Sequence, residues 1–119
     1  MASQRMIRTN EEIRREISET INNGLKDPRV QDVLISIVEV DATNDLKTAK
    51  VYVSVLADDE VKQDVMEGLN AAGGYIRKEL ARKVNLRNTP ELIFKLDESI
   101  EYGVDMFRKI DEVMNESEK

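Results

Sequence analysis

The sequence predicts an α+β domain in which three strands form one mixed sheet and helices pack on one of its faces. Segments 33–40 and 47–56 are rich in β-branched residues, and 91–96 is a third short run of strand-forming residues. The stretches around them repeat apolar residues at helical spacing. Paired glycines at 73–74 divide the central helical stretch, since each glycine inside a helix costs about 1 kcal/mol relative to alanine. The element order is therefore α-β-β-α-α-β-α, the pattern of an α+β sandwich.

The length and composition suit one small, very soluble domain. The chain has 119 residues, of which 40% are hydrophobic and only 4% aromatic, so the core must be built from aliphatic side chains. We place the domain at residues 1–115 and expect a short disordered tail at residues 116–119.

The first helix is predicted over residues 3–23. Ser3 is a suitable N-cap, and Gly24 stands where a left-handed glycine ends many helices. A loop follows at residues 26–29, because Pro28 cannot continue a helix and pushes its predecessor into an extended conformation. The buried stripe of this helix is expected to comprise Met6, Ile13, Ile17 and Ile21.

The first two strands are predicted to form an antiparallel hairpin. Residues 33–40 are hydrophobic on both faces, which indicates a covered position in the sheet. Residues 41–46 have the composition of a turn. Residues 47–56 alternate between core-facing and outward-facing side chains, and those expected to face the core are Ala49, Val51, Val53 and Val55.

Two helices joined by a sharp bend follow the hairpin. The acids at 58–60 lie at the positive end of the next helix dipole. The bend is predicted at Ala72-Gly73-Gly74, and the second helix of the pair extends to about Val84. After a connection at 85–90 and the third strand, a final helix is predicted from residue 97. Its inner side would carry Ile100, Val104, Phe107, Ile110 and Met114.

Positive charge is concentrated after the bend, although the net charge is −6. Residues 72–90 carry five basic groups and one acid, whereas residues 31–71 carry nine acids and three basic groups. Because salt screens charges over about 8–10 Å, such a local patch matters more than the net total. The five cations of this patch are Arg77, Lys78, Arg82, Lys83 and Arg87.

The composition argues against an enzyme. The chain has no cysteine and no histidine, so it lacks thiolate chemistry and the commonest general base and metal ligand. It shows no nucleophile–base pair, no phosphate-binding glycine loop and no metal-binding motif, and we expect no cofactor. No apolar run approaches the ~20 residues of a membrane span, and the N-terminus lacks the apolar core of a secretory signal. We therefore expect a cytoplasmic monomer without a membrane partner.

A helix–bend–helix between the second and third strands resembles the type II KH fold, whose members hold RNA through a GxxG loop. This chain has the Ala-x-Gly bend of residues 72–74 at that point. It also has Lys-Asp-Pro-Arg at 26–29, Gly-Tyr-Ile-Arg at 74–77 and Thr-Pro-Glu-Leu at 89–92. With these motifs in this order, the chain resembles the ribosome-binding factor A family of bacteria over nearly its whole length.

The resemblance implies a non-catalytic assembly factor that binds the small (30S) ribosomal subunit or its precursor. It implies assistance to late 16S rRNA maturation and to growth in the cold, with ribosomal proteins and an assembly GTPase as further candidate partners. Because the bend replaces the GxxG loop, recognition of folded rRNA shape and phosphates is expected. The alternative is an acidic protein-interaction adaptor that has no specific affinity for RNA.

The candidate RNA-binding residues are the five cations after the bend, together with Lys26 and Arg29 in the loop and Arg5 and Arg8 in the first helix. The alternative for the cations is a solvated helix face paired with surrounding acids. Arginines of the first helix could likewise pair locally, for example Arg15 with Glu11. The glycines of the bend allow a tight corner in either case, and their missing side chains would also let an RNA backbone approach. Tyr75 could stack on a base, although semi-buried packing is the commoner role of tyrosine.

Overall fold

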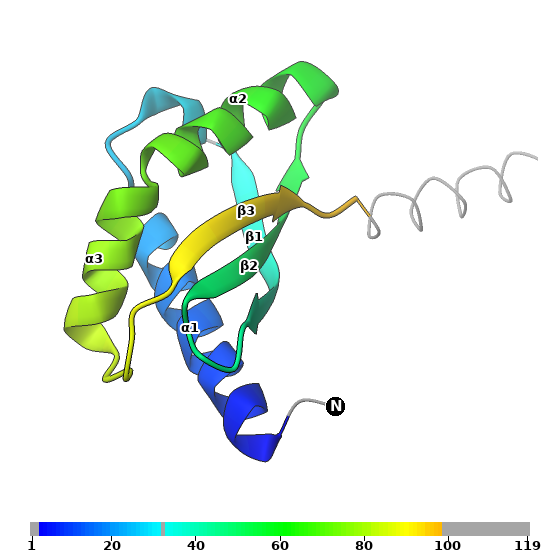
Figure 1. The fold of residues 1–119 in the computed structure, drawn as a ribbon. Coiled ribbons are helices and arrows are strands. Elements are labelled where there is room, and N and C mark those ends of the chain that lie inside the picture. The colour runs from blue at the N-terminus through cyan, green and yellow to red at the C-terminus, as the bar shows by residue number, and fades with distance from the viewer. Residues whose placement is uncertain (1–2, 32, 99–119) are drawn as a thin grey trace, which may run out of the picture.

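The computed structural model describes residues 3–31 and 33–98, and Figure 1 shows how their helices and strands are arranged. The observed order is α-β-β-α-α-β with a short 3₁₀-helix, η1, after the first helix, which confirms the α+β class. The predicted final helix, with Ile100 to Met114 on its inner side, lies outside the described residues, as does the predicted tail. The elements are α1 (Gln4–Asn22), η1 (Pro28–Val30), β1 (Leu34–Ala42), β2 (Thr48–Leu56), α2 (Asp59–Ala71), α3 (Gly73–Lys83) and β3 (Glu91–Leu96).

The sheet is mixed and has the order β1-β2-β3. The hairpin of β1 and β2 is antiparallel, whereas β3 runs parallel to β2, with Thr48 opposite Glu91. Strand β2 alternates as predicted, and its inward-facing residues are almost fully buried. Figure 1 shows α1 lying behind the sheet and α2 and α3 meeting at an angle beside it.

An aliphatic core joins the helices to the sheet. Ile13 and Ile17 of α1, Leu69 of α2, and Ile76 and Leu80 of α3 are all fully buried. The predicted stripe of α1 is confirmed at its centre, while Met6 and Ile21 at its ends are only partly buried.

Local capping explains where the helices begin and end. The Ser3 hydroxyl accepts a hydrogen bond from the Met6 N–H at 3.2 Å, and the Asp58 carboxylate accepts one from the Val61 N–H at 3.0 Å. Gly24 has φ +96°, the left-handed conformation predicted for the residue after the α1 cap. These predictions of the helix boundaries are confirmed to within one residue.

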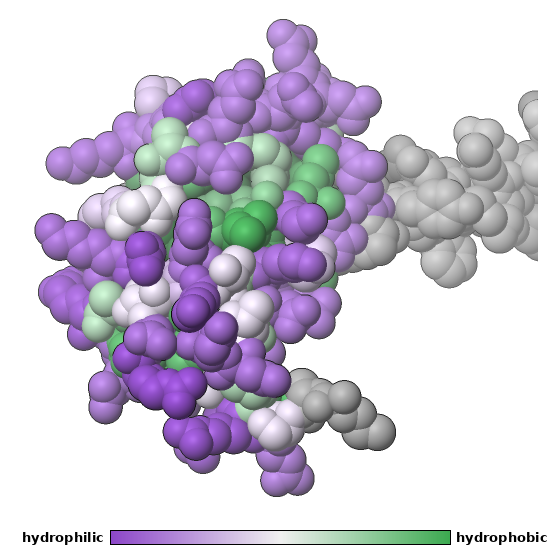
Figure 2. All heavy atoms as spheres, viewed as in Figure 1, coloured by the Kyte–Doolittle hydropathy of each residue, from purple (hydrophilic) through white to green (hydrophobic). Residues whose placement is uncertain are grey.

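The predicted covered position of β1 is wrong within the described residues, where β1 is an edge strand. Its register with β2 shifts between Ile37 and Glu39, so a β-bulge interrupts the alternation. As a result, Ile37 and Val40 are both buried although they are three residues apart. The strand therefore has apolar residues at both odd and even positions, although only one of its faces is buried. Leu34 and Leu56 are 66% and 67% exposed on the other face. Figure 2 shows apolar side chains among polar ones on the side of the molecule seen there.

Candidate nucleic-acid interface

The bend between α2 and α3 is a single residue, Ala72. Its φ and ψ are −84° and −1°, so it keeps a right-handed conformation. The Ala72 N–H donates to the Gly68 carbonyl, and the Ala72 carbonyl accepts from the Ile76 N–H, both at 2.9 Å. Ala72 therefore caps both helices. The predicted bend is confirmed, with its two glycines inside the first turn of α3.

The glycines after the bend are not required by packing among the described residues. Neither Gly73 nor Gly74 has a positive φ. A Cβ at Gly73 would lie 3.9 Å from the Phe94 ring, an ordinary contact, and a Cβ at Gly74 would meet nothing within 4 Å. The missing side chain at Gly74 thus leaves open space on the outside of α3.

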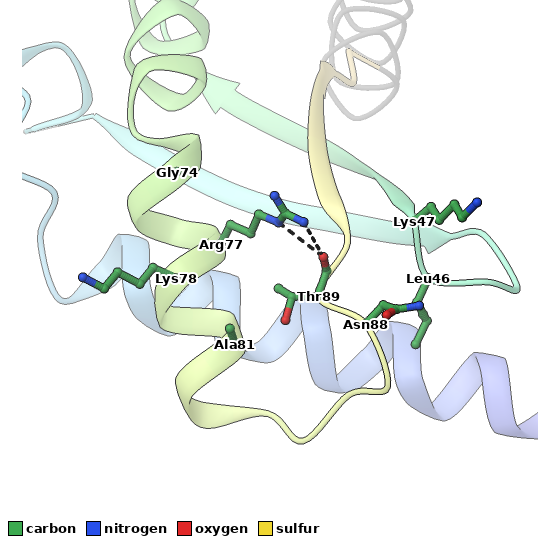
Figure 3. Close-up of a pocket in the computed structure, with 8 residues that line it drawn as sticks. All are labelled: Leu46, Lys47, Gly74, Arg77, Lys78, Ala81, Asn88 and Thr89. Carbon is green, nitrogen blue, oxygen red and sulfur yellow. Dashed lines mark hydrogen bonds between the residues drawn. The ribbon is translucent and has the colours of Figure 1, made fainter.

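That space belongs to a hollow of about 650 Å³ between α3 and two loops, drawn in Figure 3. Gly74, Arg77 and Lys78 line it from α3, Lys47 lines it from the turn between β1 and β2, and Thr89 lines it from the connection to β3. Three cations from two distant parts of the sequence therefore surround one concave surface.

Arg77 has a structural partner in this hollow. Its Nε and Nη2 donate to the Thr89 carbonyl at 3.3 and 2.8 Å, which ties the connection before β3 to α3. Figure 3 shows Arg77 reaching towards Thr89, while Lys47 and Lys78 extend away from it on opposite sides. Among the described residues, the ammonium groups of Lys47 and Lys78 have no hydrogen-bond or ion-pair partner, so both are free to bind phosphate.

A second hollow, of about 490 Å³, lies on the other side of the same turn. Arg5 from α1 and Arg87 from the connection to β3 both line it, and Leu46 lines both hollows. Leu46 has φ +58° and is nonetheless buried, so the turn is held in a strained conformation. The Asn88 side-chain amide donates to the Asp45 carbonyl at 3.2 Å and links the turn to the connection. The structure therefore brings together Arg5, Arg77, Lys78 and Arg87 around one turn.

Two of the predicted cations on α3 instead pair with acids. The Arg82 Nη2 lies 2.7 Å from Glu79 Oε2, and this hydrogen bond lowers the pKa of Glu79. The Lys83 ammonium lies 3.3 Å from Oε1 of Glu16, which connects α3 to α1. The alternative of a helix face paired with acids therefore describes Arg82 and Lys83, but not Lys78.

Arg29 is also engaged in the fold. Its Nε lies 3.0 Å from Asp27 Oδ1 and its Nη2 lies 2.6 Å from Oδ2. This guanidinium, together with a hydrogen bond from the Arg29 backbone N–H, lowers the pKa of Asp27 to about 2. Its Nη1 lies 3.7 Å from Glu67 on α2. The neighbouring η1 packs so closely on α2 that a Cβ at Gly68 would lie 2.9 Å from Val30 Cγ1. Arg29 thus helps to hold η1 against α2.

The remaining predicted residues lie apart from the two hollows. Arg8 is exposed, and its Nε is 3.8 Å from Glu12. The predicted pair of Glu11 with Arg15 is wrong, because Glu11 binds Arg14 one residue earlier. Lys26 lines a third hollow beside Tyr75. The semi-buried packing favoured for Tyr75 is also wrong, since this residue is 54% exposed.

Lys47 was not predicted from the sequence. It follows a turn and has only Lys50 as a nearby cation, so no cluster of cations marks it in the sequence, and only the fold brings it opposite α3. Within residues 3–31 and 33–98, no helix combines the length and apolarity needed to cross a membrane. In the same residues, no group of three or more acids is placed to hold a metal ion.

The helix–bend–helix before the parallel strand β3, the Ala-x-Gly bend and the surrounding cations define a KH-like domain of type II without a GxxG loop. Comparison of the sequence with known families shows which KH-like family the chain belongs to. A family model described as ribosome-binding factor A matches residues 5–110, and the chain belongs to that family.

Individual relatives agree with this assignment. The chain is 53% identical over 107 residues to ribosome-binding factor A of Agathobacter rectalis, covering 90% of this chain and 88% of the relative. It is similar to the solution structure of a putative ribosome binding factor A from Thermotoga maritima, with a TM-score of 0.70 and 31% identity over 85% of this chain and 94% of that one. It is also similar to a homology model of the Thermus thermophilus ribosome binding factor A fitted into the cryo-electron microscopy map of a 30S complex. That likeness has a TM-score of 0.60 and 27% identity, over 75% of this chain and 91% of that one.

Proposed function

We propose that this protein binds the small ribosomal subunit or its precursor and assists late maturation of 16S rRNA without catalysing a reaction. The observation that carries the proposal is the match of the family over residues 5–110, which includes every lining residue of both hollows except Ser3. The fitted 30S complex of the Thermus thermophilus relative supports the small subunit as the partner. Binding would stabilise one arrangement of the rRNA and shift its folding equilibrium towards that arrangement.

The free cations around the turn are the proposed contacts with rRNA phosphates. Lys47 and Lys78 line the first hollow, and Arg5 and Arg87 line the second. Phosphate contacts fix position and orientation without reading sequence, which suits recognition of a folded rRNA surface. The open space at Gly74 would let the RNA backbone come close to α3.

Co-sedimentation with separated 30S, 50S and 70S particles tests the binding. We expect selective migration with 30S that weakens as salt rises. The charge reversal Lys78→Glu should weaken migration, whereas Lys95→Glu, an exposed site on the outer face of β3, is the matched control. Equal migration with all particles would contradict specific binding, and no migration would favour a protein-interaction adaptor.

Maturation requires a separate measurement in cells. Deleting the gene should raise the ratio of precursor to mature 16S rRNA, and the wild-type chain should restore it better than the Lys78→Glu variant. A normal ratio in the deletion strain, despite binding to 30S, would contradict the maturation role alone.

A further inference from the structure

A third hollow, of about 440 Å³, lies between the segment after α1 and the bend. Gly24 and Leu25 line one side, and Ala71 and Ala72 at the end of α2 line the other. Tyr75, in the first turn of α3, lines the hollow and is 54% exposed. This hollow shares no lining residue with either of the cation-lined hollows.

The lining of this hollow suits a flat, largely apolar group. Leu25 is buried beneath it, and the alanines and glycine around it leave the Tyr75 ring accessible. The carboxylate of Asp27 also lines the hollow, but the Arg29 guanidinium occupies both of its oxygens. The polar groups left for a ligand are thus at the rim, and the interior offers a stacking surface.

Positive charge stands beside the tyrosine. Lys26 lines the hollow, is exposed, and has no hydrogen-bond or ion-pair partner in the described part of the chain. Arg82 lies on the same face of α3, seven residues or about two turns after Tyr75, but its guanidinium is paired with Glu79, so Lys26 is the free cation at this hollow. An aromatic ring next to a free cation is the combination that binds an unstacked base together with its phosphate.

We infer that the hollow beside the bend binds one unstacked nucleotide of single-stranded RNA, with its base on the Tyr75 ring and its phosphate at Lys26. This inference rests on the proposed RNA-binding function and adds a base-stacking subsite to the phosphate contacts around the turn. A basic or aromatic side chain of a ribosomal protein is the competing occupant. The apolar interior and the free Lys26 favour the nucleotide, because a cationic side chain would be repelled by Lys26.

Binding of a ten-nucleotide oligoadenylate, measured by fluorescence anisotropy, tests the subsite. Tyr75→Leu removes the ring but keeps an apolar side chain, and it should weaken binding about tenfold. Tyr75→Phe keeps the ring and should bind within about twofold of the wild type. The same decamer with an abasic backbone should bind wild type and Tyr75→Leu equally. Lys26→Gln should make the slope of log K against log salt shallower by the amount expected for the loss of one phosphate contact.

Tyrosine fluorescence gives a direct readout of the contact. The chain has no tryptophan and three tyrosines, so stacking on Tyr75 should quench part of the emission, and Tyr75→Phe should lose that part. Equal oligoadenylate binding by wild type and Tyr75→Leu, with unchanged thermal unfolding, would overturn the inference.

The outcomes separate this inference from the proposed function. If wild type migrates with 30S but Tyr75→Leu changes neither that migration nor oligoadenylate binding, only the nucleotide subsite is overturned. If Tyr75→Leu weakens 30S binding but not oligoadenylate binding, the hollow contacts ribosomal protein and the nucleotide is overturned. If wild type fails to bind 30S but shows ring-dependent oligoadenylate binding, the proposed function fails and the subsite stands.

Discussion

At the scale of single residues, a substitution at Gly74 can distinguish an effect on stability from an effect on RNA binding. An added Cβ there would meet nothing within 4 Å, and alanine favours a helix over glycine. Gly74→Ala should therefore leave the free energy of unfolding unchanged or raise it by up to about 1 kcal/mol. If an RNA backbone lies against α3 at this point, the same methyl group should weaken migration with 30S.

The neighbouring glycine provides the matched control. Gly73→Ala adds the same methyl group one residue earlier, near the Phe94 ring and outside the lining of the first hollow. Urea unfolding and co-sedimentation of both variants measure the two effects. Equal 30S binding by Gly74→Ala and wild type would show that no backbone approaches here.

Asp27 gives a residue-scale prediction for pH. The Arg29 guanidinium and, to a smaller extent, the Arg29 backbone N–H lower its pKa from an ordinary 3.8 to about 2, so the folded state favours the carboxylate. The resulting stability is complete above about pH 4 and is lost as the pH falls towards about 2. In Arg29→Ala, the pKa of Asp27 should rise part of the way towards 3.8, because the backbone hydrogen bond to Asp27 remains, and this loss of stability on acidification should become smaller.

Carboxyl NMR titration of Arg29→Ala measures this change. Glu79 is the internal control, because Arg82 lowers its pKa and Arg82 is untouched by the substitution. An Asp27 pKa that stays near 2 in the variant would contradict the assignment of Arg29 as its cause. A shifted Glu79 would instead indicate a wider change of structure.

The residues that the sequence could predict are those whose roles are local. Ser3 caps its own helix and Gly24 ends it, so their neighbours in the chain suffice to place them. Lys47 and Leu46 could not be predicted, because their roles depend on α3 and on the connection to β3. A leucine with positive φ also runs against the local preference for glycine or asparagine.

At the scale of elements, the contact between α1 and α3 yields a prediction about Lys83. Its partner Glu16 has a side chain only 12% exposed, and the Lys83 ammonium is the only ion-pair partner of that carboxylate in the described residues. Lys83→Met would leave a nearly buried carboxylate without its counter-charge. We expect the free energy of unfolding to fall by about 1–2 kcal/mol.

Arg82→Met is the matched control for this prediction. Arg82 pairs with Glu79 within α3, but the Arg82 side chain is 68% exposed, so the loss of this pair should change the free energy of unfolding little. Thermal and urea unfolding of both variants make the comparison. Equal stability of Lys83→Met and wild type would show that the contact between α1 and α3 does not depend on this pair.

Strand β1 shows why an element can be predicted correctly and its surroundings wrongly. The β-branched run from 33 to 40 does form a strand, because that property is local. Its exposure depends on the bulge at Ile37 and Glu39, which moves Ile37 and Val40 onto one face. Nothing in the sequence of this run marks the extra residue of the bulge. Its apolar residues at odd and even positions therefore indicated a strand covered on both faces, whereas β1 is an edge strand among the described residues.

For the whole molecule, the uneven distribution of acidic and basic residues determines how a protein with a net negative charge can approach RNA. The net charge of −6 repels phosphate at long range, so attraction must come from cations that face the RNA together within a Debye length of about 8–10 Å. Pairing with Glu79, Glu16 and Asp27 withdraws three of the predicted cations from this role. The uneven charge therefore favours one orientation of binding.

The salt dependence of 30S binding counts the cations that take part. Four phosphate contacts predict a slope of log K against log salt of about −2.8 to −3.6. The contacts expected to contribute are Arg5, Lys47, Lys78 and Arg87. Arg87→Gln should reduce the slope by about 0.7–0.9, whereas Lys95→Gln on the outer face of β3 should leave it unchanged. If both substitutions reduced the slope equally, binding would follow total charge, and the two hollows around the β1–β2 turn would not be the interface.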